Sequence, residues 1–153
     1  MAWPSGTTVR EQVLDNILST CLSISAPGSK TTVNFAGFVG NDVFMVPGYP
    51  AVLLASPSVS YDDSIHGIIS CKMRVAVVLV LDTSTNTLDS ISDFVEDFRM
   101  ALLADHTRGG VAVDTHISQD DTAPTSVPEP YIVADVVLDV TYRHLRADPT
   151  AEI

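Results

Sequence analysis

The feature that most constrains the fold is a run of alternating residues at Tyr131–Leu145. Every second position from Ile132 to Tyr142 is apolar, whereas the alternate positions from Val133 to Arg143 include two aspartates, a threonine and an arginine. Because successive side chains of a strand point to opposite faces of a sheet, this pattern predicts a strand with one buried face. We therefore expect a sheet that is covered by helices on one side.

A second long strand is predicted at Ile68–Leu81, and its second half, Val75–Leu81, contains only apolar residues. An apolar run without alternation indicates a strand that is covered on both faces. We expect this run to form the centre of the core, so that Val78→Asp would unfold the protein by burying an unpaired charge. The run is also far shorter than the ~20 apolar residues that span a bilayer, so we expect no membrane-spanning segment.

Two helices are predicted at Val9–Leu22 and Leu88–Ala104, because their apolar residues recur every three or four positions. Thr8 precedes the first helix and Glu11 follows three residues later, which is a capping-box pattern. Beyond the second helix, Gly109–Gly110 suits a left-handed stop and a tight turn.

The other segments are expected to be short strands and loops. The strands are expected at Val33–Val39, Val43–Val46, Ala51–Ser60 (extended, interrupted by Pro57) and Val111–Ile117, and the loops at Ser25–Thr32 and Gln119–Pro130. The order α-β-β-β-α-β-β predicts an α+β fold, with a mostly antiparallel sheet of about four to five strands and two amphipathic helices on one face. We expect a single domain, 1–153, with flexible tails at 1–7 and 147–153.

The charge balance limits the partners of the chain. Asp and Glu number 19 against 8 Lys and Arg, which gives a formal net charge of −11. This balance argues against wrapping DNA or RNA and against docking on an anionic membrane surface. The two cysteines, Cys21 and Cys71, form no disulfide framework, and the N-terminus shows no signal peptide, so we expect a cytoplasmic protein with reduced thiols.

Several titratable residues are candidate catalytic groups. Cys71 is a candidate nucleophile with His106, His116 or His144 as its base, but it falls on a predicted buried strand, where thiols are usually inert. Gly109–Gly110 follows a helix and lacks the P-loop pattern, so a turn is expected there and not a phosphate site. We expect no enzyme activity, no catalytic residue and no cofactor.

Five residues are candidates for contact with a partner or with the lumen of an assembly. Asp62 and Asp63 lie with His66 in a predicted turn, and their spacing matches no strong metal signature, so we expect no metal there. Asp120 and Asp121 form an acidic pair in a predicted loop. Trp3 precedes the first helix, which it can staple, or it can insert into a neighbouring subunit; the sequence leaves both open.

Two stretches of the sequence carry a resemblance to a known family. Residues Leu102–Gly110 read LLADHTRGG and residues Ala134–Arg143 read ADVVLDVTYR, and looser agreement extends from the first helix to Pro149. In this order and spacing the chain resembles the tail terminator (tail completion) proteins of long-tailed bacteriophages, which share a fold with tail tube proteins.

The resemblance implies a structural virion protein of the tail or neck, assembled in the host cytoplasm. Such a protein forms a homo-oligomeric ring, usually a hexamer, at the head-proximal end of the tail tube. The implied partners are the tail tube protein and the head–tail connector or stopper protein, and DNA would pass through an acidic lumen without specific binding.

The sequence leaves two other hypotheses for the function open. One is a different tail-tube-like neck or head–tail joining protein, because these proteins share the fold. The other, from a different class, is a small bacterial α+β domain that binds a ligand or acts as an enzyme.

Overall fold

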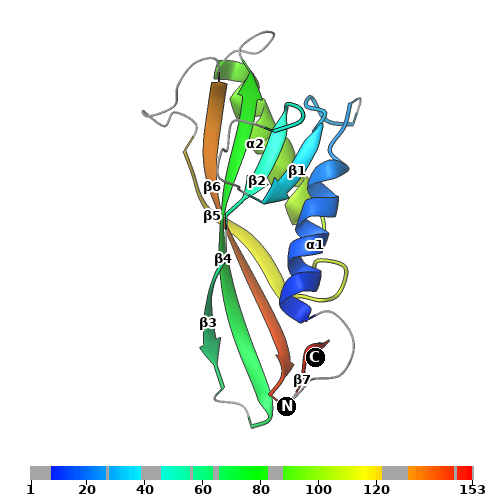
Figure 1. Ribbon diagram of the computed structural model, residues 1–153, viewed down its shortest axis with the longest axis vertical. Helices are drawn as coiled ribbons and strands as arrows, with labels where there is room; N and C mark the ends of the chain where they lie inside the picture. Colours follow the sequence, from blue (N-terminus) through cyan, green and yellow to red (C-terminus); the bar gives the residue numbers. More distant parts are fainter. Residues whose placement is uncertain are drawn as a thin grey trace.

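The computed structural model describes residues 8–26, 28–38, 46–55, 57–63, 66–82, 88–121, 131–146 and 148–152. These residues form two helices and seven strands (Figure 1). The helices are α1 (Val9–Leu22) and α2 (Leu88–Leu103). The strands are β1 (Phe35–Phe38), β2 (Ala51–Leu54), β3 (Ser58–Asp62), β4 (Ile68–Asp82), β5 (Asp114–Asp121), β6 (Tyr131–Leu145) and β7 (Asp148–Glu152).

All seven strands belong to one sheet with the order β1-β2-β4-β6-β5. Strands β2 and β3 pair with different parts of β4, β2 with residues 77–80 and β3 with residues 70–74. Strand β7 pairs with the end of β6. Every pairing is antiparallel except β1 with β2. The α+β class, the mostly antiparallel sheet and both long strands are therefore confirmed.

The sheet contains more strands than the sequence indicated, for two physical reasons. The extended segment predicted at Ala51–Ser60 divides into β2 and β3 near Pro57, which has no backbone N–H to donate to a ladder. At the other end, the expected flexible tail at 147–153 contains β7, which turns back after Leu145 to pair with β6. This short polar segment has no strong strand pattern of its own and depends on a partner edge.

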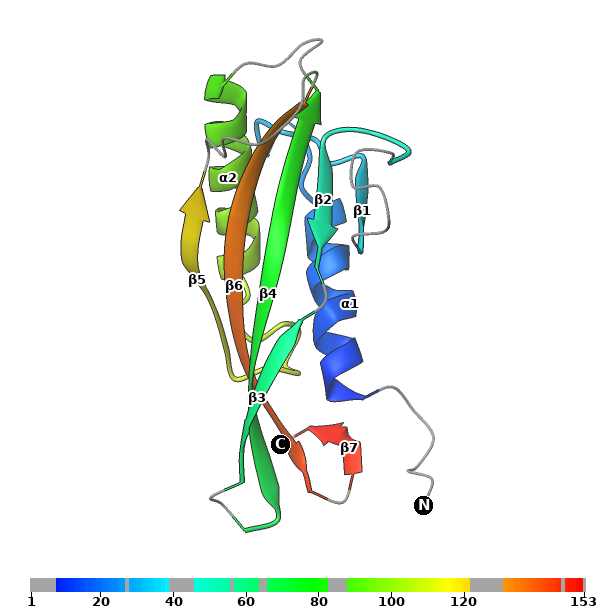
Figure 2. The same cartoon turned by 60° about the vertical axis from the view of Figure 1, so that its left-hand side comes forward.

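The helices pack on one face of the sheet, as predicted (Figure 2). Thr8 caps α1, since its side chain accepts a hydrogen bond from the backbone N–H of Glu11 at 3.1 Å. Alternate residues of the two long strands then meet the helices. The main core contains Val13, Ile17, Cys71, Met73, Val75, Val77, Leu79, Phe94, Phe98, Leu102, Val136, Leu138 and Tyr142, among others.

The described residues cover the opposite face of the sheet, which we call the open face, only at one end. There Ala51, Leu53, Val80 and Val133 form a small second cluster of buried residues. Along β4 the open face otherwise carries exposed Lys72, Arg74 and Ala76 and half-buried Val78. The predicted double coverage of Val75–Leu81 is thus confirmed at only one end, and Val77, not Val78, lies in the main core.

The region around β5 differs most from the prediction. The strand begins at Asp114 and not at Val111, because the turn after α2 continues through Val111. It then extends to Asp121, so the segment expected to be a loop from Gln119 begins as a strand. A bulge between Ile117 and Gln119 breaks the alternation that would have revealed this. Most of the predicted Val43–Val46 strand, the rest of the 119–130 loop and the 1–7 tail lie outside the described residues.

Candidate interaction surface

The open face bears a polar groove between β3, β4, β6 and β5, with a volume of about 610 Å³. Its polar lining residues are Ser58, Ser60, Lys72, Arg74, Asp114, His116, Asp139 and Thr141. They lie side by side because register pairs Ser58 with Arg74, Arg74 with Asp139, and Asp139 with His116 across four neighbouring strands. We take this face as the candidate site.

Asp139 organises the middle of the groove. One oxygen of its carboxylate lies 3.0 Å from Nε of Arg74, and the other lies 3.9 Å from Nε2 of His116. Partial burial alone would raise the pKa of Asp139, but hydrogen bonds from Arg74 and Ser118 and the charges of Arg74 and His116 together lower it below its ordinary value. The Arg74 charge is therefore largely neutralised within the chain.

Two further cations of the open face have no such partner. Lys72 is exposed, and neither it nor Arg143 makes a hydrogen bond or ion pair within the described part of the chain. The Nε atom of Arg143 is even buried without an acceptor among the described residues. With Arg74, these residues place three of the 8 Lys and Arg on one half of one face.

The other half of the open face is acidic. Asp121 of β5 lies directly opposite Asp135 of β6. Partial burial, followed by the charge of Asp121, raises the pKa of Asp135 above its ordinary value. Asp120 is exposed and takes the opposite side of β5, because successive residues of a strand alternate. The structure thus separates the predicted Asp120–Asp121 pair onto two faces.

The other predicted contact residues fall at the opposite end of the molecule or outside the described chain. Asp62 is the last residue of β3 and lies on the open face, in register with Ser70. Asp63 follows it and forms an ion pair with Arg146, with 3.3 Å between Oδ2 and Nη2. The two carboxylates therefore do not act as a pair. Trp3 lies outside the described residues.

The predicted thiol and histidines are placed differently from one another. Cys71 faces the helices, and burial, partly offset by a hydrogen bond with Tyr142, raises the pKa of its thiol. Burial also raises the pKa of Cys21 to about 12. His116 lies on the open face, on the other side of the sheet from Cys71. His144 lies on the same face as Cys71, and its Nδ1 is 2.7 Å from the carbonyl oxygen of Leu145. His106 lies 3.6 Å from a carboxylate oxygen of Asp114. Among the described residues, no group of three or more His, Cys, Asp and Glu is placed to hold a metal ion.

The turn after α2, residues 105–110, is built around one carboxylate. Asp105 accepts hydrogen bonds from the backbone N–H of Thr107 at 3.0 Å, from its hydroxyl at 2.7 Å, and from the N–H of Gly109 at 2.7 Å. These bonds, the hydroxyl bond first, lower the pKa of Asp105. The predicted turn at Gly109–Gly110 is confirmed, and both glycines have positive φ, at 72° and 92°.

Arg108, in the same turn, is the residue whose role the sequence did not reveal. It has a φ of 51° and is 1% exposed, and its guanidinium donates hydrogen bonds to the carbonyl oxygens of Leu102 and Asp105. The buried arginine therefore supplies a donor to Leu102 in the last turn of α2, where carbonyl groups lack helical partners, and to Asp105 in the turn that follows. Its Nε and Nη1 atoms have no acceptor among the described residues. The run Asp105–Gly110 is accounted for by this structural role.

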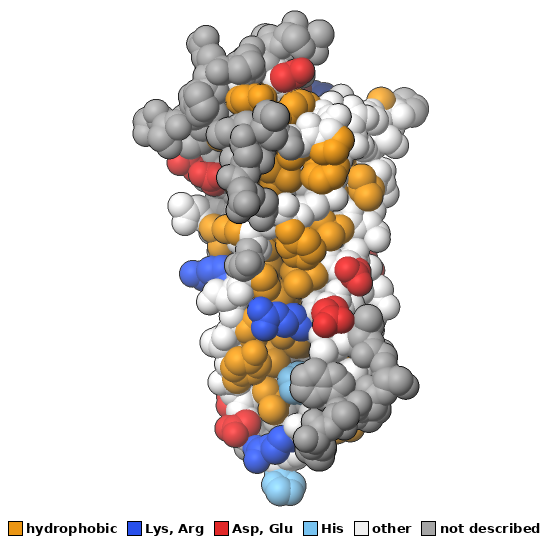
Figure 3. Space-filling view, in the orientation of Figure 1, with side chains coloured by type: hydrophobic (Ala, Val, Ile, Leu, Met, Phe, Trp, Pro, Cys, Tyr) orange, Lys and Arg blue, Asp and Glu red, His pale blue; other side chains and the backbone are white. Residues whose placement is uncertain are grey.

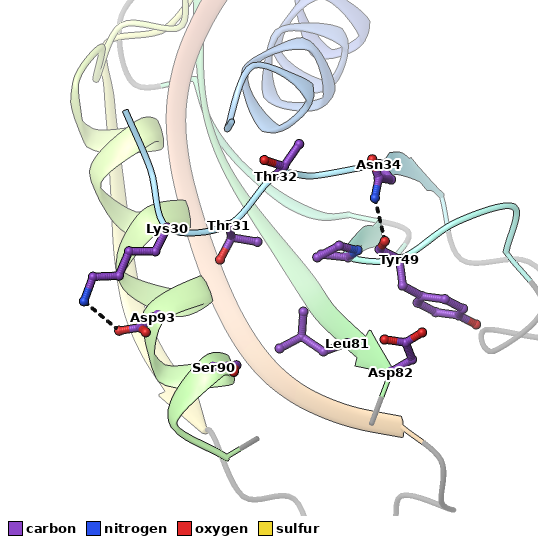
Figure 4. A pocket seen from close by; sticks show the side chains of 10 residues that line it. Lys30, Thr31, Thr32, Asn34, Tyr49, Leu81, Asp82, Ser90 and Asp93 are labelled. Atoms are coloured by element: carbon purple, nitrogen blue, oxygen red, sulfur yellow. Dashed lines mark hydrogen bonds and ion pairs between the residues drawn. The ribbon is translucent and has the colours of Figure 1, made fainter. Parts of the chain in front are cut away.

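A second cavity, of about 400 Å³, lies between the segment before β1, the start of α2 and the end of β4 (Figure 4). Its charged groups include Lys30 and Asp93, which form an ion pair at 3.4 Å. Asn34 donates through Nδ2 to the carbonyl oxygen of Tyr49 at 2.6 Å. The cavity is polar, and its principal donors are already engaged with neighbouring residues.

Large apolar side chains are also exposed on the surface. Leu22 of α1, Phe38 of β1 and Tyr61 of β3 are each at least half exposed. Figure 3 shows hydrophobic side chains in a column along the middle of the visible face, with charged groups scattered beside them. Large contiguous apolar patches often mark interaction surfaces, whereas single exposed apolar side chains are common on protein surfaces.

No family model matches the chain, and no curated protein matches it at a significant level. No helix among the described residues is long and apolar enough to cross a membrane.

Proposed function

We propose that this chain is a tail terminator of a long-tailed bacteriophage. In this role six copies form a ring at the head-proximal end of the tail tube, stop its polymerisation and join it to the head–tail connector. The proposal rests first on the likeness of residues 102–110 and 134–143 to that family, and the protein would act in the virion without catalysis.

The observation that best supports the proposal is the one-sided layering of the sheet. Both helices cover one face, while among the described residues the open face is buried at one end only (Figure 2). A subunit of a ring needs surfaces that remain uncovered in the monomer and are buried by its neighbours. The open face and the exposed Phe38 and Tyr61 provide such surfaces.

The net charge of −11 is consistent with the passage of DNA through such a ring. A ring of such chains would repel phosphate groups, and so DNA would move past its wall without sticking. The partners of the ring in this proposal are the tail tube protein on one side and the connector or stopper protein on the other.

The test is to purify the chain and the tail tube protein from the same source, and to view each alone and both together by negative-stain electron microscopy. We expect rings of the chain, or tubes that carry a cap at one end and stop growing. A chain that stays monomeric and leaves tube length unchanged would contradict the proposal. Rings that bind a connector but no tube would favour a different neck protein.

A ligand-binding domain is the second candidate, and the polar cavity beside Lys30 and Asp93 favours it (Figure 4). A ligand that binds the folded state raises the melting temperature by mass action. A thermal-shift screen with small polar metabolites therefore separates the two candidates. A reproducible shift that Lys30→Ala abolishes would favour the ligand-binding domain.

A further inference from the structure

We propose that the copies in the ring associate front to back, with the unpaired cations of the open face on one copy seated against the unpaired carboxylates of α1 on the next. This inference rests on the proposed function and names the contact by which the ring closes. The occupant of the open face is therefore a second copy of this chain.

The cationic side of the contact is formed by Lys72 and Arg143. They lie diagonally across β4 and β6, since Lys72 pairs with Thr141 and Arg143 pairs with Ser70. Neither makes an ion pair within the described residues, whereas nearby Arg74 is already held by Asp139. Two carboxylates border this patch on the same face, Asp62 of β3 beside Ser70 and Asp114 of β5 beside Thr141.

The anionic side is formed by Glu11 and Asp15 of α1. Both side chains are exposed, and their carboxylates make no hydrogen bond or ion pair within the described residues. The acids of α2 differ, because Asp93 pairs with Lys30, Glu96 pairs with Arg99, and Asp97 accepts a hydrogen bond from the N–H of Thr31. Among the acidic groups of the two helices whose side chains are described, Glu11 and Asp15 are those that remain available.

The two patches lie on opposite sides of the molecule, because α1 packs on the face of the sheet that is turned away from the open face (Figure 2). A contact between opposite sides is heterologous, and repeated heterologous contacts generate a ring when the rotation closes. The only cation of α1, Arg10, is half-buried, and its charge acts to lower the pKa values of Cys71 and Tyr142 in the protomer's own sheet.

The spacing of groups along the two patches also agrees. Glu11 and Asp15 are one helical turn apart, about 6 Å, and Lys72 and Arg143 are diagonal neighbours at about 7–8 Å. Leu22 lies on the same side of α1 as Asp15 and about 10 Å further along the helix, at 1.5 Å per residue. Its side chain is 52% exposed. Exposed Ala76 lies about 13 Å beyond Lys72 along β4, at 3.3 Å per residue. Each patch thus presents a charged pair followed by an apolar group.

The test uses two charge-reversed double variants of the full chain. The sheet-face variant carries Lys72→Glu and Arg143→Glu, and the helix-face variant carries Glu11→Lys and Asp15→Lys. We expect each alone to associate at least about tenfold more weakly than the wild type in sedimentation velocity, because like charges then face each other. An equimolar mixture of the two should associate again, since every contact in an alternating ring pairs opposite charges.

The matched control is Lys30→Glu with Arg99→Glu, which changes the net charge as much as the sheet-face variant does but removes cations already paired beside α2. We expect this control to associate as the wild type does. If it weakens association equally, or if the mixture fails to recover, the proposed contact is wrong. Circular dichroism melts establish that each variant is folded, and Lys72→Glu alone replaces the sheet-face variant if Arg143→Glu disturbs folding.

The same samples separate this inference from the proposed function. A sheet-face variant that still forms rings and stops tubes as the wild type does would overturn the contact and leave the terminator role standing. A wild type that neither associates nor limits tube length would overturn both. Association that weakens as salt shortens the Debye length from about 30 Å at 0.01 M to 3 Å at 1 M supports the contact, and association that is insensitive to salt contradicts it.

Discussion

At the scale of single residues, Arg108 is the most consequential side chain in the structure. It is almost fully buried and donates to two carbonyl oxygens at the end of α2. Burial, only partly offset by the charges of Asp105 and Cys21, lowers its pKa. Only Nη2 donates these hydrogen bonds, and Nε and Nη1 are buried without an acceptor among the described residues, so the hydrogen bonds to the helix end offset part of the cost of burying the cation.

Replacing Arg108 with alanine should destabilise the protein by about 3 kcal/mol, because buried carbonyl groups lose their donors and a cavity remains. The measurement is the free energy of unfolding in urea. Arg99→Ala is the matched control, because Arg99 is half exposed and pairs only with Glu96, and it should cost less than about 0.5 kcal/mol. Equal losses for the two variants would contradict the capping role.

The two aspartates of the open face on β6 should respond to pH in opposite directions. The pKa of Asp139 is lowered in the folded state, so its stabilising contribution is present above the unfolded pKa of about 3.9 and is lost as pH falls through the folded value. Asp139→Asn should therefore cost about 1 kcal/mol at pH 7, and less as the pH falls below about 4.

Asp135 is the counterpart, because its pKa is raised in the folded state. The charged form then destabilises the fold as pH rises through the folded pKa, so Asp135→Asn should stabilise the protein at pH 7 and lose that advantage below about pH 4. Urea unfolding at a series of pH values measures both variants. Parallel pH profiles for the two would show that the environments of these carboxylates do not differ as described.

At the scale of elements, the long strands were predictable and the short ones were not. The bounds of β6 follow from its alternation, and α1 and α2 follow from their period and the cap at Thr8. The strand at Asp148–Glu152 carries no such pattern. It forms by pairing with the free edge of β6, which sequence periodicity does not show. The bulge before Gln119 likewise depends on pairing, so it left no signal that sequence periodicity could detect.

The interaction surface was less predictable than the fold. The sequence pointed to acidic residues, and the groove instead joins Arg74, Asp139 and His116, which are far apart in the chain. Only the register of four strands brings them together. The alternation of Tyr131–Leu145 places Asp139 and Arg143 on the face opposite the buried one. This alternation was the only sequence pattern that indicated residues of the open face.

The alternation of β4 gives a prediction that two neighbouring residues can test. Val77 is 1% exposed in the main core, whereas Val78 lies half-buried on the open face. Val77→Asp buries an unpaired charge and should abolish folding or cost more than about 4 kcal/mol, while Val78→Asp should cost distinctly less. Thermal and urea unfolding of both variants provide the measurement, and a reversed order would mean that the faces of β4 are assigned wrongly.

At the scale of the whole molecule, the helices and the sheet divide the surface into regions of different charge. The helix side carries Glu11 and Asp15. One half of the open face carries Lys72, Arg74 and Arg143 among the carboxylates of Asp62, Asp114 and Asp139, and the other half carries Asp121 and Asp135. A net charge of −11 alone would describe a uniformly repulsive particle. In the proposed ring, the distribution of the 8 cations allows the open face of one copy to contact α1 of the next copy.

The central ladder of the sheet also determines when the chain can fold. Strands β4 and β6 pair residue by residue without a shift, from Asp82 with Tyr131 to Ile68 with Leu145. Pairing between strands so distant in sequence slows folding, because the entropy of closing the intervening loop is lost before the strand contacts stabilise the chain. During translation, β4 therefore leaves the ribosome with one edge unprotected until β6 has been synthesised. Through that interval its valine-rich strand is an aggregation hazard, which makes the rate of elongation past residue 131 a determinant of yield.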